Sequence, residues 1–234
     1  MVTVAIHQPN YVPWLGFFHK LAAADVFVFL EDVQYSKGSY INRVQILQDG
    51  KAAWLTIPVH VRFGQHIDAI VPARMDWVKA HLGSLYNAYK GAAGFRRAWE
   101  SIERIYDKLP DASLARGNRE LIERIARRLG LSTRFASSKD FQVSDLGASD
   151  RLIAITNSIS PDAVYLSGQG GAKYQDPRKF AAAGLGFGYT GFTHPVYVQR
   201  SDSFIPGLSI LDVVLHCGWE QAATLARSAA ATVK

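Results

Sequence analysis

Short apolar runs near both ends of the chain predict buried β-strands. Residues 2–6, 26–30 and 163–166 are almost continuously hydrophobic, which is typical of parallel strands covered on both faces. Residues 16–24 lie between the first two runs and predict a short helix. The chain therefore opens with a strand–helix–strand unit. Two further strand candidates follow, at residues 54–59 and 67–71.

The middle of the chain has a helical period instead. Apolar side chains recur there at intervals of three or four residues: Val78, Leu82, Leu85 and Tyr89, then Ile122, Ile125 and Leu129. Glu120 and Glu123 each stand four residues before an arginine, so this basic run predicts a solvated helix face. A contact surface for tRNA or a carrier protein is the alternative interpretation. We predict a helical insert at about residues 76–130.

The last third of the chain returns to alternating helices and strands. Residues 149–157 predict a helix, and the apolar run at 163–166 ends in a glycine-rich turn, "SGQGGAKY". A helix from Asp176, a short strand at 187–192 and a helix that begins after Ser209 follow. We therefore expect one α/β domain over residues 1–234. Its three layers would contain a mainly parallel, Rossmann-like sheet with the helical insert.

Composition narrows the class of protein. The 234 residues are 48% hydrophobic, enough for one well-filled core, and the net charge of +6 is only mildly basic. No apolar run approaches the roughly 20 residues of a membrane span, and the N-terminus does not resemble a secretory signal. We expect a cytoplasmic protein without a membrane span. Its single cysteine, Cys217, excludes an internal disulfide, and its place at an apolar helix end predicts a buried thiol.

Three strand ends carry the residues suited to chemistry. The first run ends in His7, the second in Glu31 and Asp32, and the third in the turn at 167–171. Ligands of open parallel sheets bind outside the carboxyl ends of the strands, so these ends predict one pocket. His7 and Asp32 are the candidate catalytic residues. His7 would act as acid or base, and Asp32 would orient it, act as a base or bind a sugar hydroxyl. A structural histidine and a turn-capping aspartate are the alternatives.

Residues suited to binding surround these strand ends. Lys37, Asn42 and Arg43 could hold phosphate or carboxylate groups, and the glycines of the turn leave backbone N–H groups uncovered. Aromatic rings nearby could stack on a base or a sugar, although most aromatic side chains belong to the core. No group of His, Asp or Glu has metal-ligand spacing, and no cofactor motif is present, so we expect neither. The candidate substrate-binding residues are Gln8, Tyr11, Trp14, Gln34, Tyr35, Lys37, Asn42, Arg43, Ser167, Gly168, Gly170 and Tyr174.

The segment "IHQPNYVPWLGFFHK…ADVFVFLEDVQYSKGSYINR" resembles the WbqC-like family. The similarity continues through "WLTIPV", "YLSGQGGAKY" and "SILDVVLHCG", and so covers nearly the whole chain. It implies a role in bacterial O-antigen or related polysaccharide biosynthesis, with glycyl or other aminoacyl transfer to a sugar as one suggested activity. The implied partners are a nucleotide-sugar or other amino-sugar acceptor and an activated aminoacyl or acyl donor. That donor would be a carrier protein, CoA or aminoacyl-tRNA.

The opening strand, turn and helix also resemble nucleotidylyltransferase-like domains such as pantothenate synthetase. Those proteins carry a His-x-Gly-His signature, whereas this chain has Trp14, Leu15, Gly16 and Phe17 there, and His19 stands one turn later. The sequence thus leaves three functions open. A transferase that moves an aminoacyl or acyl group onto an amino-sugar is preferred. A non-catalytic subunit that binds a nucleotide-sugar or carrier, and a nucleotidylyl transferase or ligase with altered catalytic residues, are the alternatives.

Overall fold

A computed structural model of the chain describes residues 1–109, 113–173 and 175–228, and its centre is a parallel sheet of five strands. The strand order is β5-β2-β1-β6-β7, and each neighbouring pair runs parallel. Strands β2 and β5 lie on one side of β1, and the later strands β6 and β7 lie on the other side. This confirms the α/β fold with a mainly parallel sheet. The strands are β1 (Thr3–His7), β2 (Val26–Phe29), β5 (Arg134–Ser137), β6 (Val164–Ser167) and β7 (Gly186–Tyr189).

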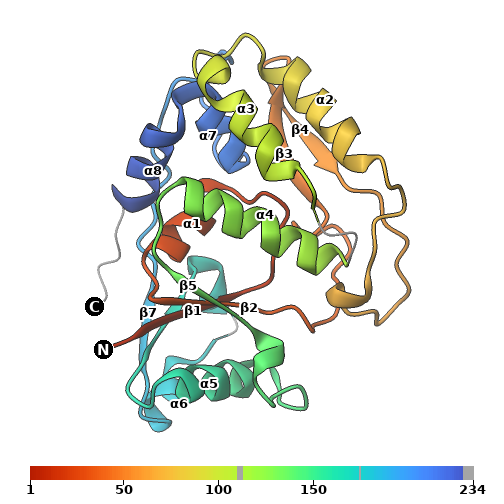
Figure 1. Cartoon of the computed structure of the whole chain (residues 1–234). Helices are drawn as coiled ribbons and strands as arrows, with labels where there is room; N and C mark the ends of the chain where they lie inside the picture. The colour runs from red at the N-terminus through yellow and green to blue at the C-terminus, as the bar shows by residue number, and fades with distance from the viewer. Residues whose placement is uncertain (110–112, 174, 229–234) are drawn as a thin grey trace.

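Helices cover both faces of the sheet and complete the three layers (Figure 1). Val4 and Ile6 of β1 pack in one hydrophobic cluster with Ile155 of α5 (Ala148–Ile159) and Phe180 of α6 (Pro177–Ala182). Ala5, between them, packs in the other cluster with helix α1 (Leu15–Ala22). Helices α7 (Ile210–Cys217) and α8 (Trp219–Ser228) contribute to this second cluster as well. Successive strand residues point to opposite faces, which explains why the three central residues of β1, Val4 to Ile6, are all apolar.

The segment between β2 and β5 builds a second structural unit on the α1 side of the sheet (Figure 1). An antiparallel hairpin of β3 (Arg43–Gln48) and β4 (Lys51–Thr56) comes first. Helices α2 (Trp77–Tyr89), α3 (Phe95–Tyr106) and α4 (Leu114–Arg128) follow within the range predicted for the helical insert. Their buried side chains join the same cluster as α1 and α7, so the insert shares the main core.

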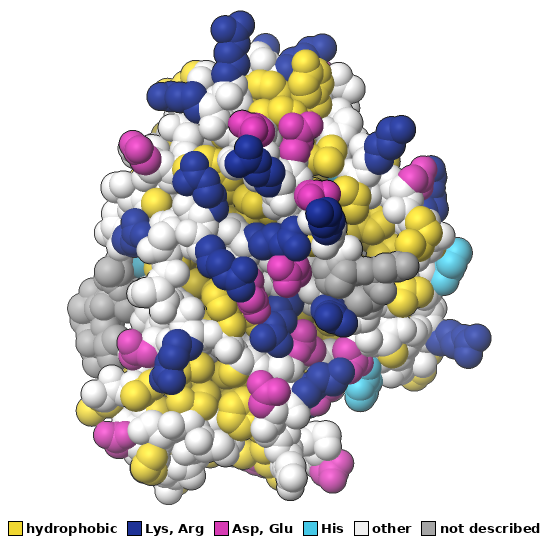
Figure 2. Space-filling model, in the orientation of Figure 1, with side chains coloured by type: hydrophobic (Ala, Val, Ile, Leu, Met, Phe, Trp, Pro, Cys, Tyr) yellow, Lys and Arg dark blue, Asp and Glu magenta, His cyan; other side chains and the backbone are white. Residues whose placement is uncertain are grey.

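The exposed side of α4 carries the interleaved charges predicted from the sequence. Arg124 pairs with Glu120, and Arg127 pairs with Glu123, both at 2.8 Å and four residues apart. Figure 2 shows the dark-blue and magenta side chains alternating over this part of the surface. The arginines are thus neutralised by their own helix, as expected for a solvated face.

Several predicted elements differ from those observed. The strand predicted at 54–59 lies at Lys51–Thr56, and residues 67–69 form a 3-10 turn rather than a strand. Two observed strands, β3 and β5, were not predicted. Arg43 therefore begins a strand at a position where none was predicted. The first helix begins at Leu15, one residue before the range predicted for it, and Pro13 lies just outside its first turn.

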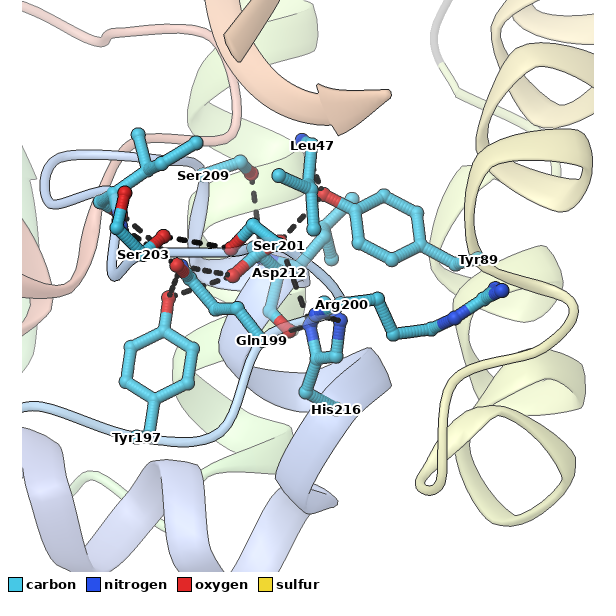
Figure 3. A network of polar contacts seen from close by, with 12 residues as sticks. Leu47, Tyr89, Tyr197, Gln199, Arg200, Ser201, Ser203, Ser209, Asp212 and His216 are labelled. Atoms are coloured by element: carbon cyan, nitrogen blue, oxygen red, sulfur yellow. Dashed lines mark hydrogen bonds and ion pairs between the residues drawn. The ribbon is translucent and has the colours of Figure 1, made fainter. Parts of the chain in front are cut away.

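A buried carboxylate fixes the long connection from β7 to α7, residues 190–209. Asp212 of α7 is fully buried and accepts hydrogen bonds from Tyr89 (2.8 Å), Tyr197 (2.7 Å) and Gln199 (2.9 Å). Figure 3 shows Tyr197 and Gln199 reaching Asp212 from the connection and Tyr89 reaching it from α2. Tyr89 also accepts a bond from the backbone N–H of Leu47 in β3. The network ties four separate segments together, and the start of the tied connection reaches the cavity described below.

No helix among the described residues is both long enough and apolar enough to cross a lipid bilayer.

Candidate functional site

The strand order reverses between β1 and β6, and a cavity of about 430 Å³ opens there. Such a reversal is where open α/β sheets bind their ligands, beyond the carboxyl ends of the strands. The volume lies within the range of small-molecule sites. The cavity is lined by residues from both strands, α1, the glycine-rich turn and the 190–209 connection: Ile6, His7, Trp14, Gly16, Phe17, Lys20, Tyr165, Ser167, Gly168, Gln169, Gly170, Gly171, Gln175, Thr190 and Phe192.

His7 stands at the end of β1 with one ring nitrogen already bonded. Its Nδ1 lies 2.9 Å from the carbonyl oxygen of Gln8, and since a carbonyl only accepts, Nδ1 carries the proton. Nε2 therefore holds the free lone pair of a neutral imidazole. The ring packs edge-on against Phe17 at 5.0 Å. The pKa of His7 is lowered to about 3, chiefly by burial and then by repulsion from Lys20, while the bond to Gln8 opposes both effects.

Lys20 is a buried cation in the wall of the same cavity, and its side chain was not among the sequence-based candidates. Its exposed fraction is only 4%. The ammonium donates to the carbonyl of Ile6 at 3.3 Å and lies 5.7 Å from the centre of the Phe27 ring. Among the described residues, no carboxylate lies within ion-pair distance of it, and no acidic side chain lines the cavity. Burial lowers the pKa of Lys20 to about 7.

The glycine-rich turn forms the opposite wall. A Cβ added at Gly168 or Gly170 would meet no atom within 4 Å, so both positions face open space. A Cβ at Gly171 would instead lie 2.3 Å from the Ser167 hydroxyl and 2.5 Å from Gln175. Ser167 donates to Gln175 at 2.5 Å, and Gln175 donates to the hydroxyl of Tyr165 at 3.0 Å. The turn is therefore held from behind and left without side chains in front, where a ligand can approach the backbone.

Trp14 adds an aromatic wall next to the start of α1. A Cβ at Gly16 would lie 2.4 Å from the Trp14 ring, so only glycine lets this ring lie against the first helical turn. The ring also packs edge-on against Phe192 at 5.2 Å and parallel to His194 at 6.1 Å. It is fixed on three sides and presents the remaining surface to the cavity, a suitable wall for a sugar or base.

Asp32 does not line this cavity. Its carboxylate pairs with Arg151 of α5 at 2.5 Å and accepts a hydrogen bond from Ser138. Burial raises the pKa of Asp32, but the bonds from Ser138 and Arg151 lower it by more, so the net shift is downward. The Asp32 carboxylate, paired with Arg151 and bonded to Ser138, therefore joins α5 to the ends of β2 and β5. The structure therefore does not bring Asp32 together with His7, and its predicted catalytic role has no geometric support.

Tyr11 is also placed away from the cavity, in the core. His81 Nε2 donates to the carbonyl of Thr56 (3.1 Å), which leaves His81 Nδ1 to accept from the Tyr11 hydroxyl (2.7 Å). That hydroxyl accepts in turn from Tyr106 at 2.8 Å. All the hydrogen-bonding groups of this buried trio are satisfied, so Tyr11 serves to connect the opening turn to α2 and α3. Asn118 of α4 supports the same turn through a bond to the carbonyl of Pro9 at 2.9 Å.

Most of the other predicted binding residues line a second, larger hollow of about 1020 Å³, called here the 34–64 groove. Tyr35 donates to Asn42 at 2.8 Å, and Asn42 donates to the carbonyl of Ile57 at 3.0 Å, which fixes the floor. The predicted set therefore divides between two hollows. Gln8 contributes its carbonyl to His7 and lines neither one, and Tyr174 lies outside the described residues. The groove takes five members of the set: Gln34, Tyr35, Lys37, Asn42 and Arg43.

Several lining residues of the cavity were missed from the sequence, among them Lys20, Gln175, Thr190 and Phe192. A signal for Lys20 was present, because it stands three residues after Phe17 and one before Leu21, on the apolar stripe of α1. A lysine on such a stripe is a buried cation that needs a partner. Thr190 and Phe192 come from a connection without periodicity, so the sequence offered no comparable signal for them.

The fold and cavity define a class, the Rossmann-like α/β proteins with a ligand cavity where the strand order reverses. Within it, the chain belongs to the WbqC-like protein family, which matches residues 8–224. The resemblance indicated by the sequence motifs is thereby confirmed. The chain is also 35% identical over 225 residues to "Uncharacterized protein Rv1507c" of Mycobacterium tuberculosis. That similarity covers 94% of this chain and 96% of the relative.

Proposed function

We propose that the protein is a transferase of bacterial O-antigen or other surface-polysaccharide biosynthesis that moves an aminoacyl or acyl group onto an amino-sugar. Glycyl is the first candidate for the transferred group. The observation that carries the proposal is the unpaired, buried Lys20 beside His7 at the strand-order reversal. A buried cation without a carboxylate favours an anionic ligand, and the diphosphate of a nucleotide-activated sugar supplies that charge. Membership of the WbqC-like family supports the pathway.

The proposed reaction needs one proton acceptor. The amine of the sugar attacks the carbonyl carbon of the donor, a C–N bond forms, and the bond to the donor's oxygen or sulfur breaks. His7 Nε2 takes the proton from the attacking nitrogen and returns one to the leaving alcohol or thiol. Because Nδ1 is committed to Gln8, Nε2 is the nitrogen that serves. Direct transfer agrees with the absence of a Ser–His–Asp arrangement among the residues that line the cavity.

Ligand binding would adjust His7 for this role. In the free protein the neutral imidazole is a weak base, since burial and Lys20 together hold its pKa at about 3. An anion bound against Lys20 neutralises the nearby positive charge and so raises the pKa of His7. The acceptor's phosphate would thus strengthen the base at the moment when it is required.

The proposed substrates also indicate the cellular compartment of the reaction. Nucleotide-activated sugars and the three donor classes considered are cytoplasmic compounds, so the transfer would take place in the cytoplasm. The donor would be an aminoacylated tRNA, an acyl-CoA or an acylated carrier protein. None of the chemistry requires a metal or an organic cofactor, because the donor is already activated.

Single-turnover assays test the proposal. The purified protein is incubated with nucleotide-activated amino-sugars and each donor class, and mass spectrometry looks for an amide product heavier by one glycyl or acyl group. His7→Gln should retain ligand binding and slow transfer by about 10²- to 10⁴-fold. Lys20→Met should weaken binding of the sugar nucleotide. His66→Gln, a change at an exposed histidine, is the matched control and should behave as wild type. Transfer by His7→Gln at the wild-type rate would contradict the proposed chemistry.

A non-catalytic subunit that binds a nucleotide-sugar is the second candidate, and the low pKa of His7 favours it. A base as weak as the free His7 suits hydrogen bonding to a ligand better than proton abstraction. This candidate predicts sugar-nucleotide binding that depends on Lys20, with no product from any donor class.

A further inference from the structure

The 34–64 groove is a second potential binding site, separate in its lining residues from the cavity at His7. Its walls are the loop at residues 34–38, the start of β3 and the loop at residues 57–64. The lining includes Lys37, Arg43, His60 and Arg62, and within the described parts of the chain it includes no acidic side chain. Both loops turn at glycines with positive φ, Gly38 (81°) and Gly64 (78°). The groove is therefore a wide, positively charged surface hollow.

Its cations are available to a ligand. Lys37 and Arg62 are exposed, and neither forms an ion pair with a carboxylate among the described residues. This contrasts with α4, where Arg119, Arg124 and Arg127 are paired with glutamates of the same helix. Arg43 is held differently, since its guanidinium donates to the carbonyl of Gly38 at 2.5 Å and stacks 4.1 Å from the centre of the Trp54 ring. The bound carbonyl fixes the group without neutralising its charge.

Exposed aromatic rings accompany the cations. Phe63 is fully exposed at the edge of the groove, with a relative accessibility of 102%. Trp54 and Tyr40 are each more than two-fifths exposed, lie 5.6 Å apart between ring centres, and extend the stack on Arg43 outward. Folding gains free energy from a ring only when the ring is buried, so the fully exposed Phe63 contributes nothing to the packing of the core. Phe63 is instead available to stack on a ring of a ligand.

We infer that the 34–64 groove binds an unpaired nucleic-acid strand. Positive side chains that follow a phosphate backbone, combined with exposed rings on which bases stack, are how proteins hold single strands. An acidic protein surface would explain the cations but would leave Phe63 in water. A duplex would engage the cations but would not offer its base faces to the ring. The strand therefore accounts for both features, and it suits RNA and DNA equally.

The groove also indicates which aminoacyl or acyl donor the protein uses, and this step rests on the proposed function. If transfer takes place at His7, a strand bound in the 34–64 groove selects aminoacyl-tRNA, whose acceptor end is unpaired, from the three donor classes. Strand binding itself does not depend on transfer. The two proposals are distinguished because an absence of transfer leaves the binding result intact, and an absence of binding leaves carrier protein and CoA as donors.

Fluorescence anisotropy tests the inference with labelled single-stranded RNA and DNA of about ten nucleotides, within the site size of single-strand binders. Phe63→Ala should weaken binding by about fivefold or more, the effect of one lost base stack. Arg62→Gln should weaken it and reduce the slope of log K against log salt by about 0.7. Met75→Ala and Arg97→Gln change an exposed apolar and an exposed basic residue outside the groove, and should bind as wild type. Because all four side chains are exposed, none of these variants should disturb the fold.

Three outcomes would overturn the inference. The first is no binding of either strand at low salt. The second is equal loss from Phe63→Ala and Met75→Ala, which would show that the groove has no part in binding. The third is duplex of the same length binding as tightly as the single strand, which would reduce the interaction to charge alone. A preference between RNA and DNA identifies the source of the strand, and tighter binding of RNA is the result expected if the donor is a tRNA.

Discussion

The ammonium of Lys20 donates to the carbonyl of Ile6, the residue immediately before His7, at 3.3 Å. This contact joins the last turn of α1 to the end of β1 and sets a cation beside the candidate base. The pKa values of the two groups are therefore linked, and both fall below their usual range, to about 7 for Lys20 and about 3 for His7. A ligand that changes the charge at Lys20 will change the basicity of His7.

The buried ammonium gives a prediction about stability and pH. Its pKa is lower in the folded chain than in the unfolded chain, so between about pH 7 and pH 10 the unfolded state binds more protons. The free energy of unfolding must then rise with pH in this range, at most by about 1.4 kcal/mol per pH unit from this group. Lys20→Met lacks the dependence. The free energy of unfolding of Lys20→Met minus that of wild type should therefore fall from about pH 7 to about pH 9.

Denaturant unfolding in a phosphate-free buffer at both pH values measures this difference. Exposed Lys90→Met is the matched control, and its difference from wild type should stay constant. A difference for Lys20→Met that does not change with pH would show that the ammonium titrates at the usual pKa of a lysine in the folded protein.

The Tyr11 hydroxyl is predicted to be structural. Tyr11→Phe removes the donor to His81 and the acceptor from Tyr106 in a fully buried trio. We expect a loss of about 1–3 kcal/mol in the free energy of unfolding, with unchanged affinity for sugar nucleotides. Tyr86→Phe, at an exposed tyrosine, should cost nothing measurable. Calorimetric titration and denaturant unfolding of both variants separate the two roles, and weaker ligand binding with full stability would restore Tyr11 to the site.

Asp32 is predicted to act through Arg151. Asp32→Asn leaves the buried Arg151 side chain without its counter-charge, and we expect a loss of about 3 kcal/mol. Because the pKa of Asp32 is lowered on folding, its stabilising effect is present above about pH 4 and is lost as the pH falls through the folded pKa. Asp76→Asn breaks an exposed pair with Arg74 and should leave the free energy of unfolding almost unchanged. Unfolding curves near pH 7 compare them. A stable Asp32→Asn protein with little transfer would instead support a catalytic role.

A strand was predicted from the sequence where its own residues carry the signal, and was missed where its pairing depends on distant parts of the chain. The three apolar runs were recognised as strands because both faces of β1, β2 and β6 are buried, so the runs are almost continuously hydrophobic. Strand β5 reads "RFAS" and lies at the sheet edge, where one side is unpaired and the run is neither long nor apolar. Its pairing with β2 depends on the fold rather than on its own four residues.

The same argument explains the candidate site. His7 and Gly168 come together because parallel strands end at one edge, a rule that requires no side-chain information. The direction of a side chain is different, since it is decided by partners distant in sequence. Tyr11 turns to His81 and Tyr106, 70 and 95 residues away, and Asp32 turns to Arg151, 119 residues away. No local pattern around Tyr11 or Asp32 contains those partners.

The open turn after β6 supplies the sharpest test of where the ligand lies. A methyl group at Gly170 meets no protein atom within 4 Å, so Gly170→Ala should fold with wild-type stability. The methyl group would project into the space that a ligand occupies when it approaches the turn's backbone. We expect the affinity for a sugar nucleotide to fall by about tenfold or more, a cost of about 1.4 kcal/mol. Gly83→Ala on α2, where a Cβ also meets nothing, is the matched control and should bind normally. Calorimetric titration compares the variants, with melting temperature as the check on folding. Wild-type affinity in Gly170→Ala would place the ligand away from the turn, against Lys20 and Trp14 alone.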